Sequence, residues 1–171
     1  MITLTPRLYI ASLKDYNNEK LYGVWVDADQ PPELILREIN LMLKNSKFKN
    51  AEEWRIDGFE NFGDFEVSEF DSLNNISKLA FLIIEHGEIF ADFVNYQGEF
   101  TENSEENFLE SYVGLYDSKE SFSMIHFDTT YPNTCIDSLY IDYEMYMRDL
   151  FCESYIDFKT ANNQVAIFRM G

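Results

Sequence analysis

Basic residues are scarce in most of this sequence. Between Ala51 and Asp157 there are 25 Asp and Glu residues but only four Lys and Arg, a net charge of −21. The first 50 residues hold seven basic and six acidic residues, so the excess acid belongs to the later part of the chain. Charges of one sign at this density repel one another and oppose a compact fold. They also attract opposite charge, so a folded surface this negative favours a partner with a strongly positive site. The four basic residues are Arg55, Lys78, Lys119 and Arg148.

Cysteine and long apolar runs are also nearly absent. Cys135 and Cys152 lack a C-x-x-C spacing, which fits a reducing compartment and does not favour a disulfide. The longest apolar run, residues 79–84, ends at Glu85 and is too short to span a bilayer. The first residues lack the charged and apolar regions of a signal peptide. We therefore expect a soluble, cytoplasmic protein with no membrane partner.

Aromatic residues, in contrast, are abundant. They make up 16% of the chain, with 15 Phe and 11 Tyr, and hydrophobic residues make up 46%. Acidic disordered segments are poor in aromatic and β-branched residues, so this chain is expected to fold. Its charge must then lie on a structured surface, where the positions of the carboxylates are fixed.

The first 61 residues have the pattern of a small α/β domain. Residues 8–13, 21–27 and 53–57 are rich in strand-forming residues and predict three strands. Residues 15–18 are typical of a turn between the first two. Residues 31–33, Pro-Pro-Glu, indicate the start of a helix. The apolar face of this helix is expected to contain Leu34, Ile35, Ile39, Met42 and Leu43.

The next segment, residues 62–103, is predicted to be helical. One helix is capped by Asp71 or Ser72 and ends at His86, because Gly87 follows the last apolar repeat. A second, shorter helix contains the apolar residues Ile89, Phe90, Phe93 and Val94 and ends before Gly98.

The last segment, residues 104–171, is predicted to mix helices and strands. A helix capped by Ser104 is expected to continue through Tyr112 and Val113 and to end before Gly114. Further helices are predicted at residues 118–127 and 142–152, and strands at residues 154–158 and 164–168. The fold class is therefore α+β. Because no linker-like segment separates them, three small domains (1–61, 62–103 and 104–171) are expected to abut.

Neither a metal site nor a catalytic site stands out. Asp27 and Asp29 begin a calcium-like loop, but prolines occupy its fifth and sixth positions, so a turn and helix cap explain it better. His86 is placed where the end of a helix favours a cation, and His126 lies in an apolar stretch typical of a core histidine. Nucleophile-elbow, P-loop and dinucleotide motifs do not occur. We expect no enzyme activity, metal or cofactor.

Acidic residues also recur four positions apart in the predicted helices. Each such pair destabilises a helix by about 0.2–0.5 kcal/mol. A solvated acidic face explains any one pair, but their repetition indicates that the charge itself has a function. The pairs are Glu88 with Asp92, Glu102 with Glu106, Glu106 with Glu110, and Asp149 with Glu153.

Several blocks of the sequence resemble the ArdA family of antirestriction proteins. They follow one another along nearly the whole chain, at residues 8–13, 16–17, 21–28, 51–60, 85–87, 112–116 and 140–150. The chain looks like the version of these proteins carried on Gram-positive conjugative transposons. The resemblance implies a non-catalytic DNA mimic, encoded on a mobile genetic element, that inhibits type I restriction–modification enzymes. It implies that an elongated homodimer occupies the DNA-binding groove of the methyltransferase core.

Under this hypothesis carboxylates take the place of DNA phosphates, so the partner is the enzyme and not nucleic acid. The acids expected to mimic phosphates are Asp64, Glu66, Glu69, Asp71, Glu88, Asp92, Glu99, Glu102, Glu105, Glu106, Glu110, Asp117 and Glu120. The aromatic residues expected at a dimer contact are Tyr140, Tyr143, Tyr146 and Phe151. The Lys-rich residues 44–49 depart from a uniformly acidic mimic and leave the role of the first domain open. Two alternatives remain: a non-catalytic acidic adaptor for another basic protein, and a calcium-binding module.

Overall fold

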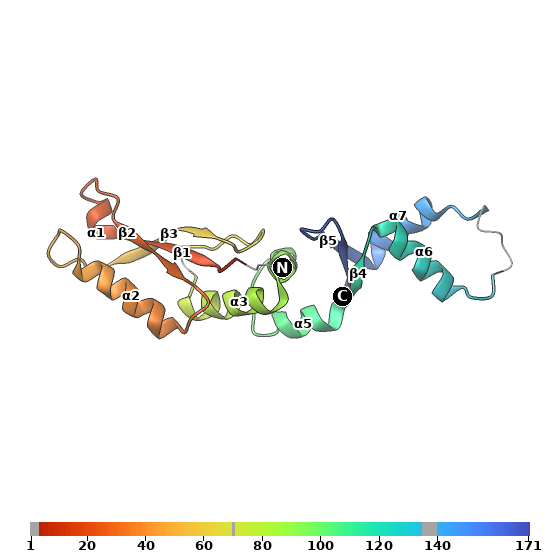
Figure 1. The fold of residues 1–171 in the computed structure, drawn as a ribbon, viewed down its shortest axis with the longest axis horizontal. Helices are drawn as coiled ribbons and strands as arrows, with labels where there is room; N and C mark the ends of the chain where they lie inside the picture. The colour runs from red at the N-terminus through yellow and green to blue at the C-terminus, as the bar shows by residue number, and fades with distance from the viewer. Residues whose placement is uncertain (1–3, 70, 135–139) are drawn as a thin grey trace. The chain divides into compact units, whose positions relative to one another are not determined.

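The computed structural model of the protein describes residues 4–69, 71–134 and 140–171. Within these residues the chain forms seven helices and two three-stranded antiparallel sheets (Figure 1), which confirms the predicted α+β class. The chain divides into two compact units, residues 1–104 (unit 1) and residues 105–171 (unit 2). The finer division into three domains stays a prediction.

Unit 1 contains a sheet with the strand order β2-β1-β3. Its strands are β1 (Arg7–Ser12), β2 (Gly23–Asp27) and β3 (Trp54–Glu60), and they confirm the three predicted strands. Alternate side chains of a strand point to the same face of a sheet. Leu8 and Ile10 of the central strand β1 follow this rule and are fully buried.

A single helical turn, α1 (Leu13–Tyr16), occupies the predicted turn between β1 and β2. Its Asp15 is only 1% exposed. The hydroxyls of Ser12 and Ser46 each donate a hydrogen bond of 2.6 Å to Oδ2 of Asp15. This buried carboxylate therefore ties α1 to the loop before β3.

Helix α2 (Pro32–Lys44) packs on this sheet and begins at the predicted prolines. Ile35 and Ile39 are fully buried against the strands. Leu34 was expected on the same face but is 44% exposed. Successive residues of a helix are turned by about 100°, so with Ile35 and Ile39 facing the sheet Leu34 lies on the flank.

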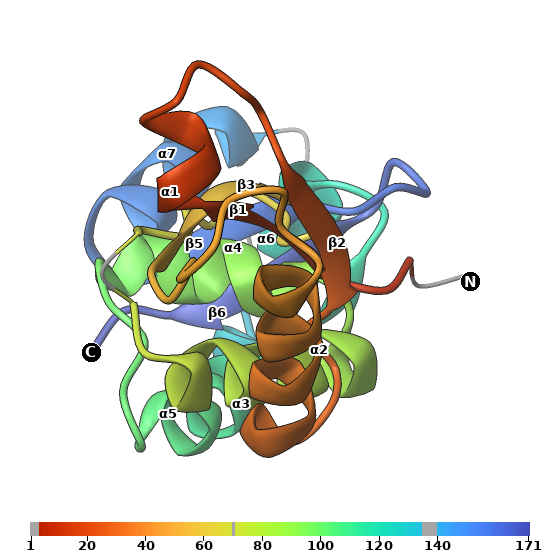
Figure 2. The same cartoon turned by 90° about the vertical axis from the view of Figure 1, so that its left-hand side faces the viewer.

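Two further helices complete unit 1, as predicted: α3 (Leu73–His86) and α4 (Glu88–Gln97). The hydroxyl of Ser72 accepts a hydrogen bond from a backbone N–H in the first turn and caps α3. Gly87 and Gly98 follow the two helices with φ values of 83° and 90°, which glycine adopts without strain. Seen from the end of unit 1, α2 lies between β2 and α3 (Figure 2).

The helix predicted after Ser104 is shorter than expected. Helix α5 covers Ser104–Ser111, and Tyr112–Tyr116 form strand β4, so the prediction that Tyr112 and Val113 are helical is wrong. Strand β4 pairs antiparallel with β6 (Val165–Arg169), with a bulge between Tyr112 and Gly114. Pairing with a distant strand outweighs the local helical pattern, because strand preference depends strongly on context.

Unit 2 is built around β6. Its sheet has the order β4-β6-β5, where β5 is Tyr155–Lys159, and residues 165–168 of the central strand are all buried. Helices α6 (Lys119–Thr130) and α7 (Tyr143–Glu153) confirm two predicted helices, and each is capped by the side chain of the residue before it. Residue Asn163, in the turn between β5 and β6, has a positive φ of 60°.

The interior of unit 2 is largely aromatic. Phe122 is 2% exposed and packs against β6. Nδ1 of His126 lies 2.7 Å from the hydroxyl of Tyr146, and its Nε2 lies 3.2 Å from the hydroxyl of Tyr155. Burial, and then the charge of Arg169, lower the pKa of His126 and favour the neutral imidazole. Both ring nitrogens thus have protein partners, as expected, but His126 is half-buried and does not lie in the core.

Replacing Ile35 by Ala should destabilise unit 1 strongly. The substitution Ile35→Ala leaves a cavity between α2 and the sheet and should cost about 2–5 kcal/mol in the free energy of unfolding. Leu41→Ala is the matched control, because Leu41 lies on the same helix but is 61% exposed. Urea unfolding followed by tryptophan fluorescence measures unit 1, since both tryptophans, Trp25 and Trp54, lie in its sheet. Equal losses in the two variants would contradict the packing of α2.

Candidate functional site

The acids expected to mimic phosphates lie on the surfaces of both units. Ten of them are exposed, and the other three, Asp71, Asp92 and Glu105, are half-buried. In unit 1 they occupy the loop before α3, helix α4 and the loop after it. In unit 2 they occupy α5, the residue after β4 and the start of α6. Each unit therefore presents carboxylates to solvent.

Several of these acids lie in the first turn of a helix. Glu88 begins α4, Glu105 and Glu106 lie at the start of α5, and Glu120 lies at the start of α6. The partial positive charge of a helix N-terminus stabilises anions by about 0.3–1 kcal/mol at exposed positions. At Glu120 a hydrogen bond with the side chain of Ser118 is the main cause of a lowered pKa. The N-termini of α4 and α5 thus offset part of the repulsion expected at Glu88 and Glu106.

One of the predicted acidic pairs is not a helical pair. Glu102 lies before α5, and its Oε1 is 3.8 Å from Nζ of Lys78. The expected repulsion between Glu102 and Glu106 on one helix is therefore wrong, because the helix begins only at Ser104. The other three pairs lie within α4, α5 and α7, as predicted.

The four basic residues of the acidic segment each lie close to an acid of that segment. With 25 acids and four basic residues, the segment has no further Lys or Arg to pair with the other acids. Its negative field is therefore available to external cations. The four pairs are Arg55 with Asp57 at 2.5 Å, Lys78 with Glu102 at 3.8 Å, Lys119 with Asp157 at 2.5 Å, and Arg148 with Asp149 at 3.9 Å.

Asp92 of α4 is held among other acids. Burial raises the pKa of its carboxyl, and the charges of Asp64 and Glu88 raise it further. The backbone N–H of Asp64 donates a 3.2 Å hydrogen bond to Oδ1 of Asp92, which offsets part of this effect. Gly63 permits the close approach, because its φ is 58° and a Cβ there would lie 3.0 Å from that oxygen. The charged form of Asp92 is thus disfavoured in the free protein.

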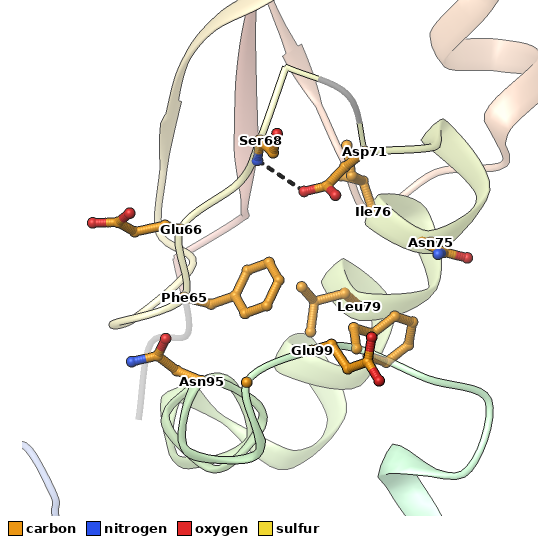
Figure 3. Close-up of a pocket in the computed structure, with 11 residues that line it drawn as sticks. Phe65, Glu66, Ser68, Asp71, Asn75, Ile76, Leu79, Asn95 and Glu99 are labelled. Atoms are coloured by element: carbon orange, nitrogen blue, oxygen red, sulfur yellow. Dashed lines mark hydrogen bonds between the residues drawn. The ribbon is translucent and has the colours of Figure 1, made fainter.

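A cavity of about 410 Å³ opens in unit 1 between the loop before α3, helix α3 and the end of α4 (Figure 3). Its floor is apolar: Ile76 and Leu79 of α3 are buried, and Phe65 and Phe100 are half-buried. In Figure 3 the ring of Phe65 points toward Leu79 across this floor. The cavity therefore exposes apolar surface within the acidic part of unit 1.

Polar side chains line the cavity beside this apolar floor, among them two carboxylates and two amides, those of Asp71, Glu99, Asn75 and Asn95. In Figure 3 Asp71 lies above Leu79 and Glu99 lies below it, whereas the carboxylate of Glu66 points away from the cavity. The backbone N–H of Ser68 donates a 2.8 Å hydrogen bond to Oδ2 of Asp71, which fixes the position of that carboxylate. Sequence reasoning found these acids but missed the cavity. The sequence does contain a signal for the cavity: Phe65 and Phe100 each stand next to an acid. A loop that is fully exposed to solvent has no need of an aromatic ring.

The aromatic residues expected at a dimer contact pack largely within unit 2. The ring of Tyr143 lies 5.7 Å from that of Phe127, and Phe151 lies 5.9 Å from Phe122. The hydroxyl of Tyr146 forms a hydrogen bond with His126, whereas Tyr140 is 83% exposed. Their part in a dimer stays a prediction.

The residues of the calcium-like loop have protein partners. Oδ1 of Asp27 lies 3.0 Å from Nε of Arg7. Glu38 stands at the twelfth position counted from Asp27, and its Oε1 accepts a 2.8 Å hydrogen bond from the side chain of Gln30. These contacts support the interpretation of the segment as a turn and helix start.

The fold and the surface define an acidic α+β protein with two small antiparallel sheets. None of its described helices is long and apolar enough to cross a membrane. The family model of the antirestriction protein (ArdA) matches residues 8–163. The chain therefore belongs to the ArdA family of antirestriction proteins. A comparison with curated proteins gives no match.

Replacing Asp92 by Asn should stabilise the protein at neutral pH. Asp92→Asn keeps an oxygen for the N–H of Asp64 but removes the disfavoured charge. Because the folded-state pKa is raised, the carboxylate lowers stability as the pH rises above its unfolded-state pKa of about 3.9. At pH 7 the gain should be below about 1 kcal/mol, since the group is half-exposed and screened. In urea unfolding, the gain should disappear as the pH falls below about 3.9.

The matched control for this variant is Glu52→Gln. It removes the same charge from an exposed position in unit 1. It should stabilise the protein less than Asp92→Asn at pH 7. Equal gains in the two variants would mean that only the net charge matters, and would contradict a local cause at Asp92.

Proposed function

We propose that this protein inhibits type I restriction–modification enzymes by occupying the DNA-binding groove of their methyltransferase core. Its family supports a restriction enzyme as the target. The observation that carries the proposed mechanism is the exposed acidic surface, in a segment whose four basic residues already lie close to acids. Carboxylates stand in for DNA phosphates and contact the Lys and Arg residues that hold DNA in the enzyme.

The mechanism depends on many weak contacts acting together. An exposed ion pair contributes about 0–1 kcal/mol, so no single acid dominates. B-DNA presents one charge per about 1.7 Å of its axis, and a mimic has to supply its carboxylates as a fixed array. The two folded units support such an array, because they hold the acids on helices and short loops.

The remaining features of the proposal come from the resemblance to the ArdA family. The protein acts by binding and catalyses no reaction. It works in the cytoplasm, where restriction enzymes meet foreign DNA, and its gene belongs to a mobile element that benefits from this protection. It acts as a homodimer, and the aromatic residues of unit 2, above all the exposed Tyr140, are the expected contacts.

The proposed mimicry predicts competition with DNA that weakens with salt. In a binding assay, the protein should displace labelled duplex DNA from a purified type I methyltransferase. Its own affinity for the enzyme should fall steeply from low to high ionic strength, because exposed ionic contacts are screened. A single substitution such as Glu106→Gln should change the inhibitory concentration less than about fivefold. An affinity that does not change with salt would overturn phosphate mimicry.

Unlabelled duplex DNA separates the mimic from an acidic adaptor. DNA should compete with this protein for the methyltransferase, because both occupy the same groove. A complex of an adaptor with another surface of the enzyme would remain intact when DNA is added. A stable ternary complex of enzyme, DNA and this protein would contradict the proposal.

A further inference from the structure

We propose that the cavity of unit 1 receives one arginine side chain of the partner, which anchors the acidic surface at a defined place. The inference rests on the proposed function, because the partner is taken to be an enzyme whose groove is lined by basic residues. The proposed function needs only the summed negative charge of the surface. This inference adds one defined site with a specific occupant.

The apolar floor is the first reason for this assignment. Leu79 and Ile76 are only 1% and 2% exposed and close the bottom of the recess, so its accessible apolar surface comes from the half-buried rings of Phe65 and Phe100. Carboxylates that only imitate phosphates need solvent around them and no apolar recess beside them. Binding of an apolar group in this recess is favourable by about 25 cal/mol per Å² of apolar surface removed from water. The occupant therefore has an apolar part.

The charge around the cavity is the second reason. Between Ile56 and Ser104 the chain has a single Lys or Arg, Lys78, and that residue lies near Glu102, which does not line the cavity. Asp71 and Glu99 have no ion pair with a described residue, so the cavity has negative charge at its edge and no cation of its own. An occupant without positive charge would desolvate these carboxylates without compensation, which is unfavourable. The occupant therefore also carries a positive charge.

Arginine combines the two properties best. Its hydrocarbon stem covers apolar surface while its charged end reaches water or a carboxylate. The planar guanidinium also stacks on aromatic rings and binds carboxylates with two parallel hydrogen bonds, whereas the ammonium of lysine is compact and strongly hydrated. A calcium ion is excluded by the apolar floor, because calcium requires six to eight oxygen ligands.

An arginine in this cavity changes how the acidic surface binds. Exposed ionic contacts fade as salt is added, but a partly buried contact is screened much less. The cavity therefore supplies a part of the affinity that persists at high salt. It also fixes the position of unit 1 along the groove, which an array of similar charges does poorly.

Paired double variants test this anchor in the competition assay. Asp71→Asn with Glu99→Gln removes the two charges of the cavity, and the new amide oxygen would still accept the N–H of Ser68. Glu106→Gln with Glu110→Gln removes two exposed charges of α5 and is the matched control. At salt above physiological strength, the cavity variant should lose at least about tenfold in affinity, and the control clearly less. Equal losses in the two variants would overturn the anchor.

A second measurement needs no enzyme and also keeps the test valid if a variant is unstable. N-acetyl-arginine methylamide, titrated into the wild-type protein, should shift the backbone NMR signals of Gly98 and Leu79, which line the cavity. The matching lysine compound should shift them less, and the Asp71→Asn, Glu99→Gln variant should respond little to either. No shift with the arginine compound, or equal shifts with the lysine compound, would overturn the assignment.

The two measurements distinguish failure of the anchor from failure of the proposed function. If the wild-type protein does not displace DNA although the arginine compound binds in the cavity, DNA mimicry fails and the cavity remains an arginine site for another partner. If the wild-type protein displaces DNA but the cavity variant behaves like its control, mimicry stands and the anchor is overturned.

Discussion

Repulsion between carboxylates is the constraint on which the rest of this structure depends. A segment with a net charge of −21 folds only because each unit buries an apolar core behind its acids. The core of unit 1 includes Leu8 and Ile10 of its sheet, and the core of unit 2 includes Phe122, which packs against β6. Helix N-termini stabilise several of the acids locally. The one fully buried acid among the described residues, Asp15, receives two hydroxyl hydrogen bonds.

Most elements of the fold could be predicted because their signals are local. Caps, prolines and glycines at the ends of α2, α3 and α4 determine where those helices begin and stop. The segment after Ser111 could not be predicted, because its strand depends on pairing with β6 about fifty residues later. The individual acids were visible in the sequence, but the cavity was not. Its floor joins Phe65, Leu79 and Phe100 from three separate segments, which only the tertiary fold brings together.

The acidic surface links stability to binding. The raised pKa of Asp92 means that the free protein holds a charge in a place where folding disfavours it. In the proposed complex, a cation of the enzyme near Asp92 would lower the cost of that charge. Replacing an unfavourable group at a functional site commonly raises the stability of a protein but lowers its activity, so such groups are retained. Asp92 is such an unfavourable group in the free protein, whereas the carboxylate of Asp15 accepts two hydroxyl hydrogen bonds inside unit 1.

The central position of β6 has a consequence for the synthesis of the chain. Both β4 and β5 pair with β6, which the ribosome makes after both of them. The second sheet therefore cannot assemble until β6 has left the exit tunnel. Until then, aromatic residues such as Phe122 lack the strand against which they pack. Unit 1 has all three of its strands within the first 60 residues and can close its own sheet much earlier. The first unit, with its acidic surface, can therefore fold while the second unit still lacks its central strand.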